Sequence, residues 1–143
     1  MLEFCIFTKD MMIHVPYIDD QHKSLVNFLN KAVEISHSNP RKAQVEKELE
    51  FLGDYVVKHF NDEELLQIKS KYPGYKEHKE MHEQFVKTFQ NLILSYIKED
   101  LCPQELSEIL VKKVAAWVIN HVKKEDVLFG KYLKSKGLDF IHP

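Results

Sequence analysis

Apolar residues recur at alternating steps of three and four along four stretches of this chain. In the second stretch the steps are 4, 3 and 4, through Val45, Leu49, Leu52 and Val56. This spacing places side chains on one face of a helix, and such a face is buried against neighbouring helices. Helix breakers are few, with 4 glycines and 5 prolines in 143 residues, and most of them separate the stretches. The pattern therefore predicts an all-α fold.

The stretches and the breakers between them predict four helices, near residues 19–37, 41–69, 74–98 and 103–134. Asn39 and Pro40 are typical of an N-cap and a first helical position, so we expect them to open the second helix. Because the connections are short, consecutive helices should run in opposite directions. The expected architecture is an up-down-up-down antiparallel four-helix bundle over about residues 18–134, with a short N-terminal lead and a short C-terminal tail. A chain of this length is expected to form a single domain, residues 1–143.

Charge and composition exclude several classes of protein. The formal net charge is −2, which leaves no basic surface for nucleic acid or for an anionic membrane. No apolar run approaches the ~20 residues that a membrane-spanning helix needs. The apolar N-terminus lacks the basic region of a signal peptide. Cys5 and Cys102 are far apart and are expected to be free thiols, which indicates the cytoplasm.

The predicted buried faces also carry residues that bind metals. Five histidines and two carboxylates continue the apolar stripes: His22, His59, Glu63, His78, His82, His121 and Asp126. Burying such groups without partners costs several kcal/mol each. No lysine or arginine occupies the same stripes, so a salt-bridge network lacks its cations. The sequence therefore predicts a metal centre inside the bundle.

The types of ligand indicate which metal is bound. Imidazole and carboxylate together suit first-row transition metals, including iron, and seven ligands are about right for two ions. A structural zinc site has four ligands, often thiolates, while calcium and magnesium prefer oxygen ligands. Ferritin-like di-iron sites use paired Glu-x-x-His motifs. This chain has only one such motif, Glu34 with His37, so we expect a histidine-rich centre with two irons.

The fourth predicted helix contains one irregular step. Asp126 follows His121 by five residues, which places it roughly 140° away around a regular helix. A one-residue slip, or π-type bulge, between 121 and 126 would return Asp126 to the buried face, and such bulges are frequent at functional sites. Alternatively, Glu125, four residues after His121, is the ligand. Periodicity leaves both possibilities open.

These residues together resemble the hemerythrin family, and within it the single-domain bacteriohemerythrins. The stretches that match cover the chain from about residue 17 to 130: Ile18 to Lys23, His59-Phe60-x-x-Glu63-Glu64, His78-x-x-x-His82 and Trp117-x-x-x-His121-x-x-x-x-Asp126. The lead differs, since many relatives carry a tryptophan before the Asp-x-Gln-His run where this chain has Phe4 and Phe7.

The resemblance implies a non-haem di-iron centre that binds O2 reversibly. It implies three histidines on one iron, two on the other, and two carboxylates bridging the irons beside an oxo or hydroxo group: His78, His82 and His121; His22 and His59; Glu63 and Asp126. It favours Asp126 over Glu125. It also places Leu25, Phe60 and Ile119 around an apolar O2 pocket.

The resemblance leads us to expect an oxygen carrier, storage or delivery protein that is not an enzyme. Two alternatives stay open: a di-iron redox enzyme acting on O2, peroxide or nitric oxide, and an oxygen- or iron-sensing module. The expected partners are O2 and, beyond it, an O2-using enzyme or a redox partner, and the oligomeric state is open. The remaining histidines and the neighbours of Glu63 are expected to face solvent: His14, His37, His142, Asp62 and Glu64.

Overall fold

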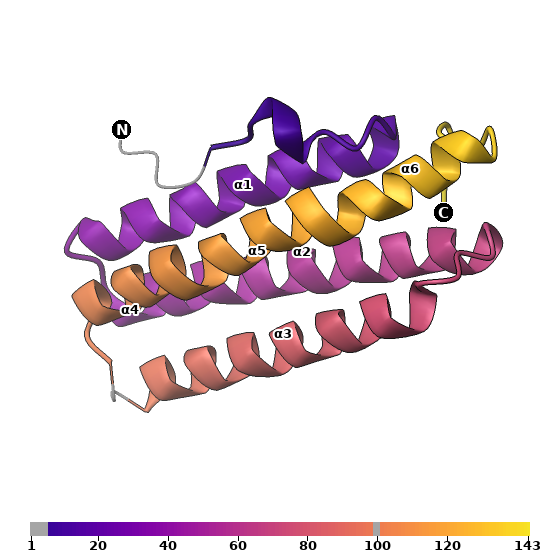
Figure 1. Ribbon diagram of the computed structural model, residues 1–143. Helices are drawn as coiled ribbons and strands as arrows, with labels where there is room; N and C mark the ends of the chain where they lie inside the picture. The colour runs from indigo at the N-terminus through magenta and orange to yellow at the C-terminus, as the bar shows by residue number, and fades with distance from the viewer. Residues whose placement is uncertain (1–5, 99–100) are drawn as a thin grey trace.

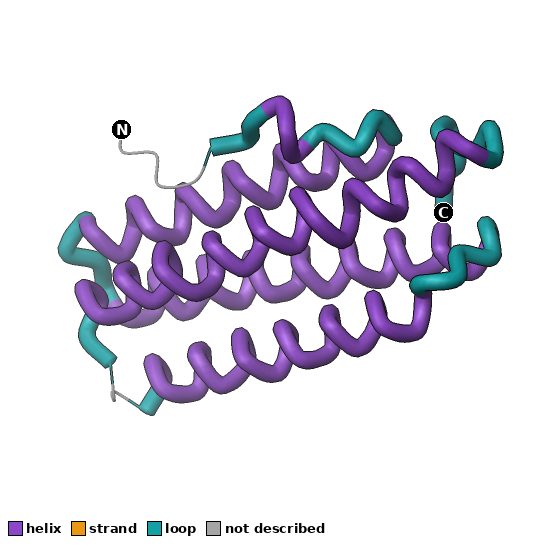
Figure 2. The backbone as a smooth tube through the Cα atoms, viewed as in Figure 1, coloured by secondary structure: helices purple, strands orange, loops and turns teal. Residues whose placement is uncertain are grey.

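The computed structural model describes residues 6–98 and 101–143, and all of their regular secondary structure is helical. Four long helical stretches lie side by side, with loops at both ends of the bundle (Figures 1 and 2). The first three are single helices: α1 (Pro16–His37), α2 (Lys42–Lys69) and α3 (Tyr75–Ile97). The predicted all-α fold and the four-helix bundle are confirmed.

The fourth stretch is divided into five consecutive segments. Three are α-helical and two are π-helical, in the order α4 (Pro103–Ile109), η2 (Leu110–Ala115), α5 (Ala116–His121), η3 (Val122–Asp126) and α6 (Val127–Ser135). All five follow one another without a loop, so they form one continuous rod (Figure 1). The predicted limits of the four helices agree with the structure to within a few residues.

The predicted N-cap of the second helix, Asn39 followed by Pro40, is wrong. The helix α2 begins at Lys42, after Arg41, and no side chain caps its first turn. Asn39 instead has a φ of 53°, in the left-handed region that asparagine tolerates better than most residues. It directly follows Ser38, the C-cap of α1. Asn39 therefore closes α1, as glycine or asparagine often does, and does not open α2.

The N-terminal lead is packed onto the bundle through a short 3-10 helix, η1 (Lys9–Met11). The backbone N–H of Ile13 donates to Asp19 Oδ1 at 2.9 Å, which ties the lead to the first turn of α1. Gly130 of α6 makes room for the backbone of Ile13, because a Cβ at position 130 would lie 2.6 Å from the carbonyl oxygen of Ile13. Gly130 thus permits a close approach of two backbones.

The two cysteines and the aromatic residues of the lead are only partly described. Cys102 is an exposed free thiol, as expected. Phe7 packs against the main hydrophobic cluster. Cys5 and Phe4 lie outside the described residues. No helix in the described ranges combines the length and the apolar character needed to cross a membrane.

The buried apolar residues form two separate clusters. The smaller one lies at the end of the bundle where the lead is attached: Ile13, Val15, Ile18, Leu66, Phe129 and Leu133. The larger one fills the rest of the interior. On α1, His22 lies between Ile18 of the smaller cluster and Leu25 of the larger one. The polar residues singled out by the sequence therefore lie between two apolar regions.

Candidate metal centre

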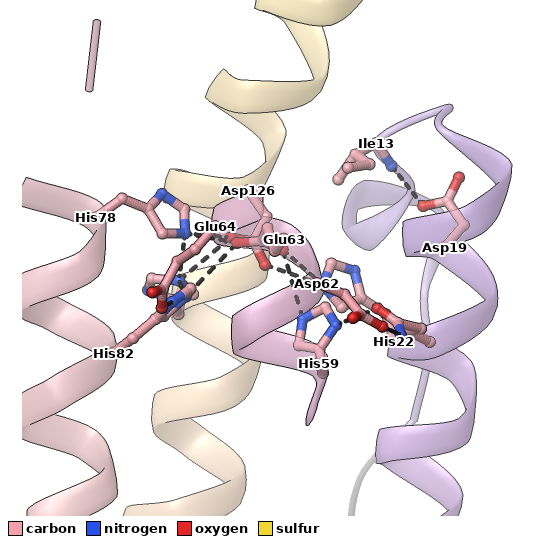
Figure 3. Close-up of polar contacts among 12 residues, drawn as sticks. Ile13, Asp19, His22, His59, Asp62, Glu63, Glu64, His78, His82 and Asp126 are labelled. Atoms are coloured by element: carbon pink, nitrogen blue, oxygen red, sulfur yellow. Dashed lines mark hydrogen bonds and ion pairs between the residues drawn. The ribbon is translucent and has the colours of Figure 1, made fainter. Parts of the chain in front are cut away.

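The seven predicted ligands converge on one place in the interior of the bundle (Figure 3). None of them is more than 7% exposed. They come from all four helical stretches: His22 from α1, His59 and Glu63 from α2, His78 and His82 from α3, His121 from α5 and Asp126 from η3. The 3-4 spacing places all of them except Asp126 on buried faces, and packing of the four faces brings the seven together.

Three histidines form the first half of the cluster. His121 Nε2 lies 3.1 Å from the Nε2 atoms of both His78 and His82. Glu63 Oε1 lies 2.6 Å from His78 Nε2 and 3.5 Å from His82 Nε2. Asp126 Oδ1 lies 3.0 Å from His78 Nε2 and 3.2 Å from His121 Nε2. Three imidazole nitrogens and two carboxylate oxygens therefore face the same small space.

Two histidines form the second half. His22 Nε2 lies 2.9 Å from Asp126 Oδ2 and 3.8 Å from Glu63 Oε2. His59 Nε2 lies 3.4 Å from the same Glu63 oxygen. Each carboxylate thus turns one oxygen to the three-histidine half and the other oxygen to the two-histidine half. This is the arrangement of two carboxylates that bridge a pair of cations.

The hydrogen bonds of the described residues test whether cations fit this place. Eight buried side-chain N and O atoms there lack a hydrogen-bond partner, and six of them belong to His22, Glu63 and Asp126. The other two belong to Gln67. Buried polar atoms without partners are rare, because each costs about 1–3 kcal/mol. Two cations bound between the carboxylates would satisfy the oxygens of Glu63 and Asp126, so the donor set fits a pair of metal ions.

The structure decides between the two readings of the irregular step in the fourth helix. Residues 122–126 are π-helical, so the chain makes one wider turn between His121 and Asp126. Asp126 is buried in the cluster, whereas Glu125 is half-buried and lies 4.0 Å from Lys124. The predicted slip is confirmed. A second π-helical segment, η2, was not predicted, although the successive steps of four from Leu106 to Val114 were a signal of it.

Comparison with known proteins identifies the family. The family described as "Hemerythrin HHE cation binding domain" matches residues 14–132. The chain belongs to the hemerythrin family. A bacteriohemerythrin from Methylococcus capsulatus is 30% identical over 122 residues, which are 85% of this chain and 90% of the relative. The myohemerythrin of Sipunculus nudus is 27% identical over 123 residues, 85% of this chain and 87% of the relative.

A solved structure agrees with the match in sequence. The crystal structure of a wild-type hemerythrin superposes with a TM-score of 0.77 at 27% identity, covering 90% of this chain and 96% of that one. The predicted resemblance to the hemerythrins, and to the single-domain bacteriohemerythrins among them, is confirmed.

Aromatic rings hold two of the hemerythrin histidines in place. Phe60 stacks on His82 with 3.7 Å between ring centroids and 1° between planes. Trp117 stacks on His121 at 4.4 Å and 10°. Stacked rings restrict the rotation of the imidazoles and exclude water from them. The predicted pocket residues Leu25 and Phe60 are buried in the larger apolar cluster, and the half-buried Ile119 packs against it.

The pKa values of the histidines reflect the two carboxylates. Burial opposes protonation of His22, but the carboxylates of Asp126 and Glu63 beside it outweigh burial and raise its pKa to about 9. Burial also opposes protonation of His78, and the same two carboxylates raise its pKa to about 10. Burial and the neighbouring His22 lower the pKa of His59 to about 4. Cations that bind here must displace protons from the raised pair, so their uptake releases protons.

The expectation that Asp62 and Glu64 face solvent is wrong. Glu64 Oε2 lies 2.8 Å from His82 Nδ1, and Asp62 Oδ2 accepts three hydrogen bonds, from Tyr17, Gln21 and Lys58. Their partners lie on other helices or outside the buried stripe, so periodicity gives no sign of them. A general rule could have found Glu64, because a metal-binding histidine usually donates its second ring N–H to a nearby carboxylate.

The other histidines follow the prediction. His14, His37 and His142 are all exposed. His37 Nε2 lies 2.7 Å from the hydroxyl of Ser107, at the end of the bundle away from the smaller apolar cluster. None of the three belongs to a group of residues that could hold a metal ion.

Proposed function

We propose that this hemerythrin binds O2 reversibly at a non-haem di-iron centre. The observation that carries the proposal is the asymmetry of the buried cluster. One half has three histidines and the other has two, while two carboxylates are shared between the halves. The half with fewer protein ligands leaves room for a small exogenous ligand.

The residues take the following roles in this proposal. One iron would be held by three histidines, the other by two, and two carboxylates would be shared between them: His78, His82 and His121; His22 and His59; Glu63 and Asp126. The iron pair, with its bridging oxo or hydroxo group, supplies the electrons that make O2 binding possible. The protein supplies ligands of fixed geometry and a dry surrounding.

We further propose that Leu25, Phe60 and Ile119 form the O2 pocket. Their support is their place in, or against, the large apolar cluster that adjoins the centre. An apolar pocket keeps water and acids away from the bound oxygen, so that it leaves as O2.

The short loops at alternate ends of the bundle support an up-down-up-down topology, and we take residues 1–143 as one domain of this type (Figure 2).

A metal count and an absorption spectrum test the proposal together. The reduced protein should contain two irons per chain, gain a charge-transfer band in air, and lose that band on degassing without releasing peroxide. One zinc per chain would contradict the di-iron centre. A band that decays in air with formation of a product would instead favour a di-iron redox enzyme.

A further inference from the structure

The two halves of the centre hold their histidines in different ways. In the three-histidine half, His82 Nδ1 lies 2.8 Å from a carboxylate oxygen of Glu64. In the two-histidine half, His59 Nδ1 lies 2.7 Å from Oε1 of Gln21, which is a neutral amide. An amide oxygen accepts a hydrogen bond as a carboxylate does, but the side chain can turn over and offer its NH2 group instead. Something must therefore hold the amide in one orientation.

Asp62 provides that constraint. Gln21 Nε2 donates to Asp62 Oδ2 at 2.8 Å. A carboxylate only accepts hydrogen bonds, so the nitrogen of the Gln21 amide has to face Asp62. Its oxygen then faces His59, and that oxygen requires a proton on His59 Nδ1. The assignment of the amide and of the tautomer follows from the chemistry of the acceptor.

The position of Asp62 is itself well determined. Besides Gln21, Tyr17 OH donates to Asp62 Oδ2 at 2.9 Å and Lys58 Nζ donates to it at 2.8 Å. Three donors from two helices meet at one oxygen, which limits the movement of the carboxylate. The Asp62 side chain is 20% exposed, so this network connects the protein surface to the buried centre (Figure 3).

We propose that Asp62 is a positioning residue for the metal centre. It orients the Gln21 amide, which keeps the proton of His59 on Nδ1 and leaves the Nε2 lone pair free to bind a metal. The inference rests on the proposed role of His59 as a ligand. This positioning also explains how the neutral Gln21 serves beside His59 where the carboxylate of Glu64 serves beside His82.

Two variants of Asp62 test the proposal. Asp62→Leu removes the acceptor at similar size, so the Gln21 amide is free to turn over. Adding Gln21→Glu to Asp62→Leu places a carboxylate directly against His59 Nδ1. Only a positioning role of Asp62 predicts that this double variant regains metal binding. Asp54→Leu is the matched control, because Asp54 is exposed on the same helix.

The first readout is a titration of the full-length chain with Co(II), followed by its absorption. Loss of an outer hydrogen-bond partner typically weakens metal binding about 10–100-fold. We expect that loss at one of the two Co(II) sites in Asp62→Leu, recovery in the double variant, and no change in Asp54→Leu. Unchanged binding in Asp62→Leu, an equal loss in Asp54→Leu, or no recovery in the double variant would overturn the proposal.

The second readout is independent of metal binding. Nitrogen NMR of the histidine rings, with helix content checked by circular dichroism, should show His59 as a single Nδ1–H tautomer in the parent and as a mixture in Asp62→Leu. A mixture already present in the parent would overturn the inference. Neither readout uses O2, so a protein that binds Co(II) as expected but fails to bind O2 reversibly would contradict the proposed function alone.

Discussion

The helix α2 and the fourth helical stretch perform the same task in different ways. Each delivers one histidine and one carboxylate to the cluster. On α2, a regular helix of 28 residues, His59 and Glu63 are four residues apart. On the fourth stretch, His121 and Asp126 are five apart, and the π-helical turn of η3 absorbs the extra residue. The number of residues between two ligands therefore predicts whether they share a helix face only when the type of helix between them, α or π, is also known.

The next turn of each helix continues the comparison. Four residues after Glu63, α2 buries Gln67, whose amide nitrogen and oxygen have no hydrogen-bond partner. Four residues after Asp126, α6 has Gly130, with no side chain at all. The space beside Gly130 is taken by Ile13 of the lead. Beyond the centre, α2 thus fills the space with its own side chain, Gln67, whereas α6 leaves the space beside Gly130 to Ile13 of the lead.

The largest effect is expected when the fourth stretch receives one more residue. Insertion of an alanine after Lys124 adds a residue that the π-helical turn of η3 does not absorb, and turns Asp126, with all of α6, about 100° around the helix axis. Asp126 would leave the cluster, and bound iron should fall by more than the ~10–100-fold typical of losing an outer partner. Metal analysis after dialysis measures this, and Lys124→Ala, which keeps the register, is the control. Two irons retained in the insertion variant would refute the role of η3.

A smaller effect is expected when the carboxylate alone is changed. Asp126→Asn keeps the π-helical turn but replaces a charged bridging group with a neutral amide, so iron affinity should fall at least about tenfold. Glu125→Gln is the matched control, since Glu125 is the neighbouring acid that lies outside the cluster. Competition with a chelator compares the two variants. If Glu125→Gln lost iron and Asp126→Asn kept it, our assignment of Asp126 would be wrong.

Gly130→Ala tests the space beyond Asp126. The new Cβ would lie 2.6 Å from the carbonyl oxygen of Ile13, a backbone atom that moves only with the lead. Overpacking typically costs about 1–3 kcal/mol, of which the better helix propensity of alanine returns up to ~1 kcal/mol. We expect a net loss of about 1–2 kcal/mol in the free energy of unfolding, measured with urea.

Gly53→Ala is the control for that experiment. Its Cβ would lie 3.2 Å from Cε2 of Phe89, a side-chain atom that is able to shift. The unfolding free energy should therefore stay level or rise slightly. Equal losses in both variants would show that the backbone contact with Ile13 is not what makes Gly130 sensitive.

The smallest effect is expected at Gln67. Gln67→Met keeps a side chain of similar length and removes a buried amide without partners, each of whose atoms costs about 1–3 kcal/mol when unsatisfied. We expect stability to rise by about 1 kcal/mol, or roughly 3 °C in Tm for a chain of this size. Calorimetry measures the change. A lower Tm would show that the amide has a partner, such as an ordered water, that stabilises the fold.

The buried faces of the helices could be predicted from the sequence because helical periodicity depends only on residues close together in the chain. Each of the seven predicted ligands occupies a position set by its own helix, and the order of breakers separated one helix from the next. The slip at η3 was one of two possibilities that the sequence offered: Phe129 and Leu133 restart the apolar stripe from Asp126, but Glu125 fits a regular helix. The contacts of Asp62 with Tyr17 and Gln21, and of Glu64 with His82, were not predictable in this way, since each depends on a residue of another helix.

Local chemistry by itself determined the helices, the buried faces and the types of ligand in this hemerythrin. Tertiary packing decided the rest. It brought Asp126 and not Glu125 into the cluster, turned one oxygen of each shared carboxylate to each half, and placed Asp62 next to Gln21, which contacts His59. The physical reason is that periodicity states which face of a helix is buried. Only the fit of side chains from all four helical stretches states which atoms on those faces meet.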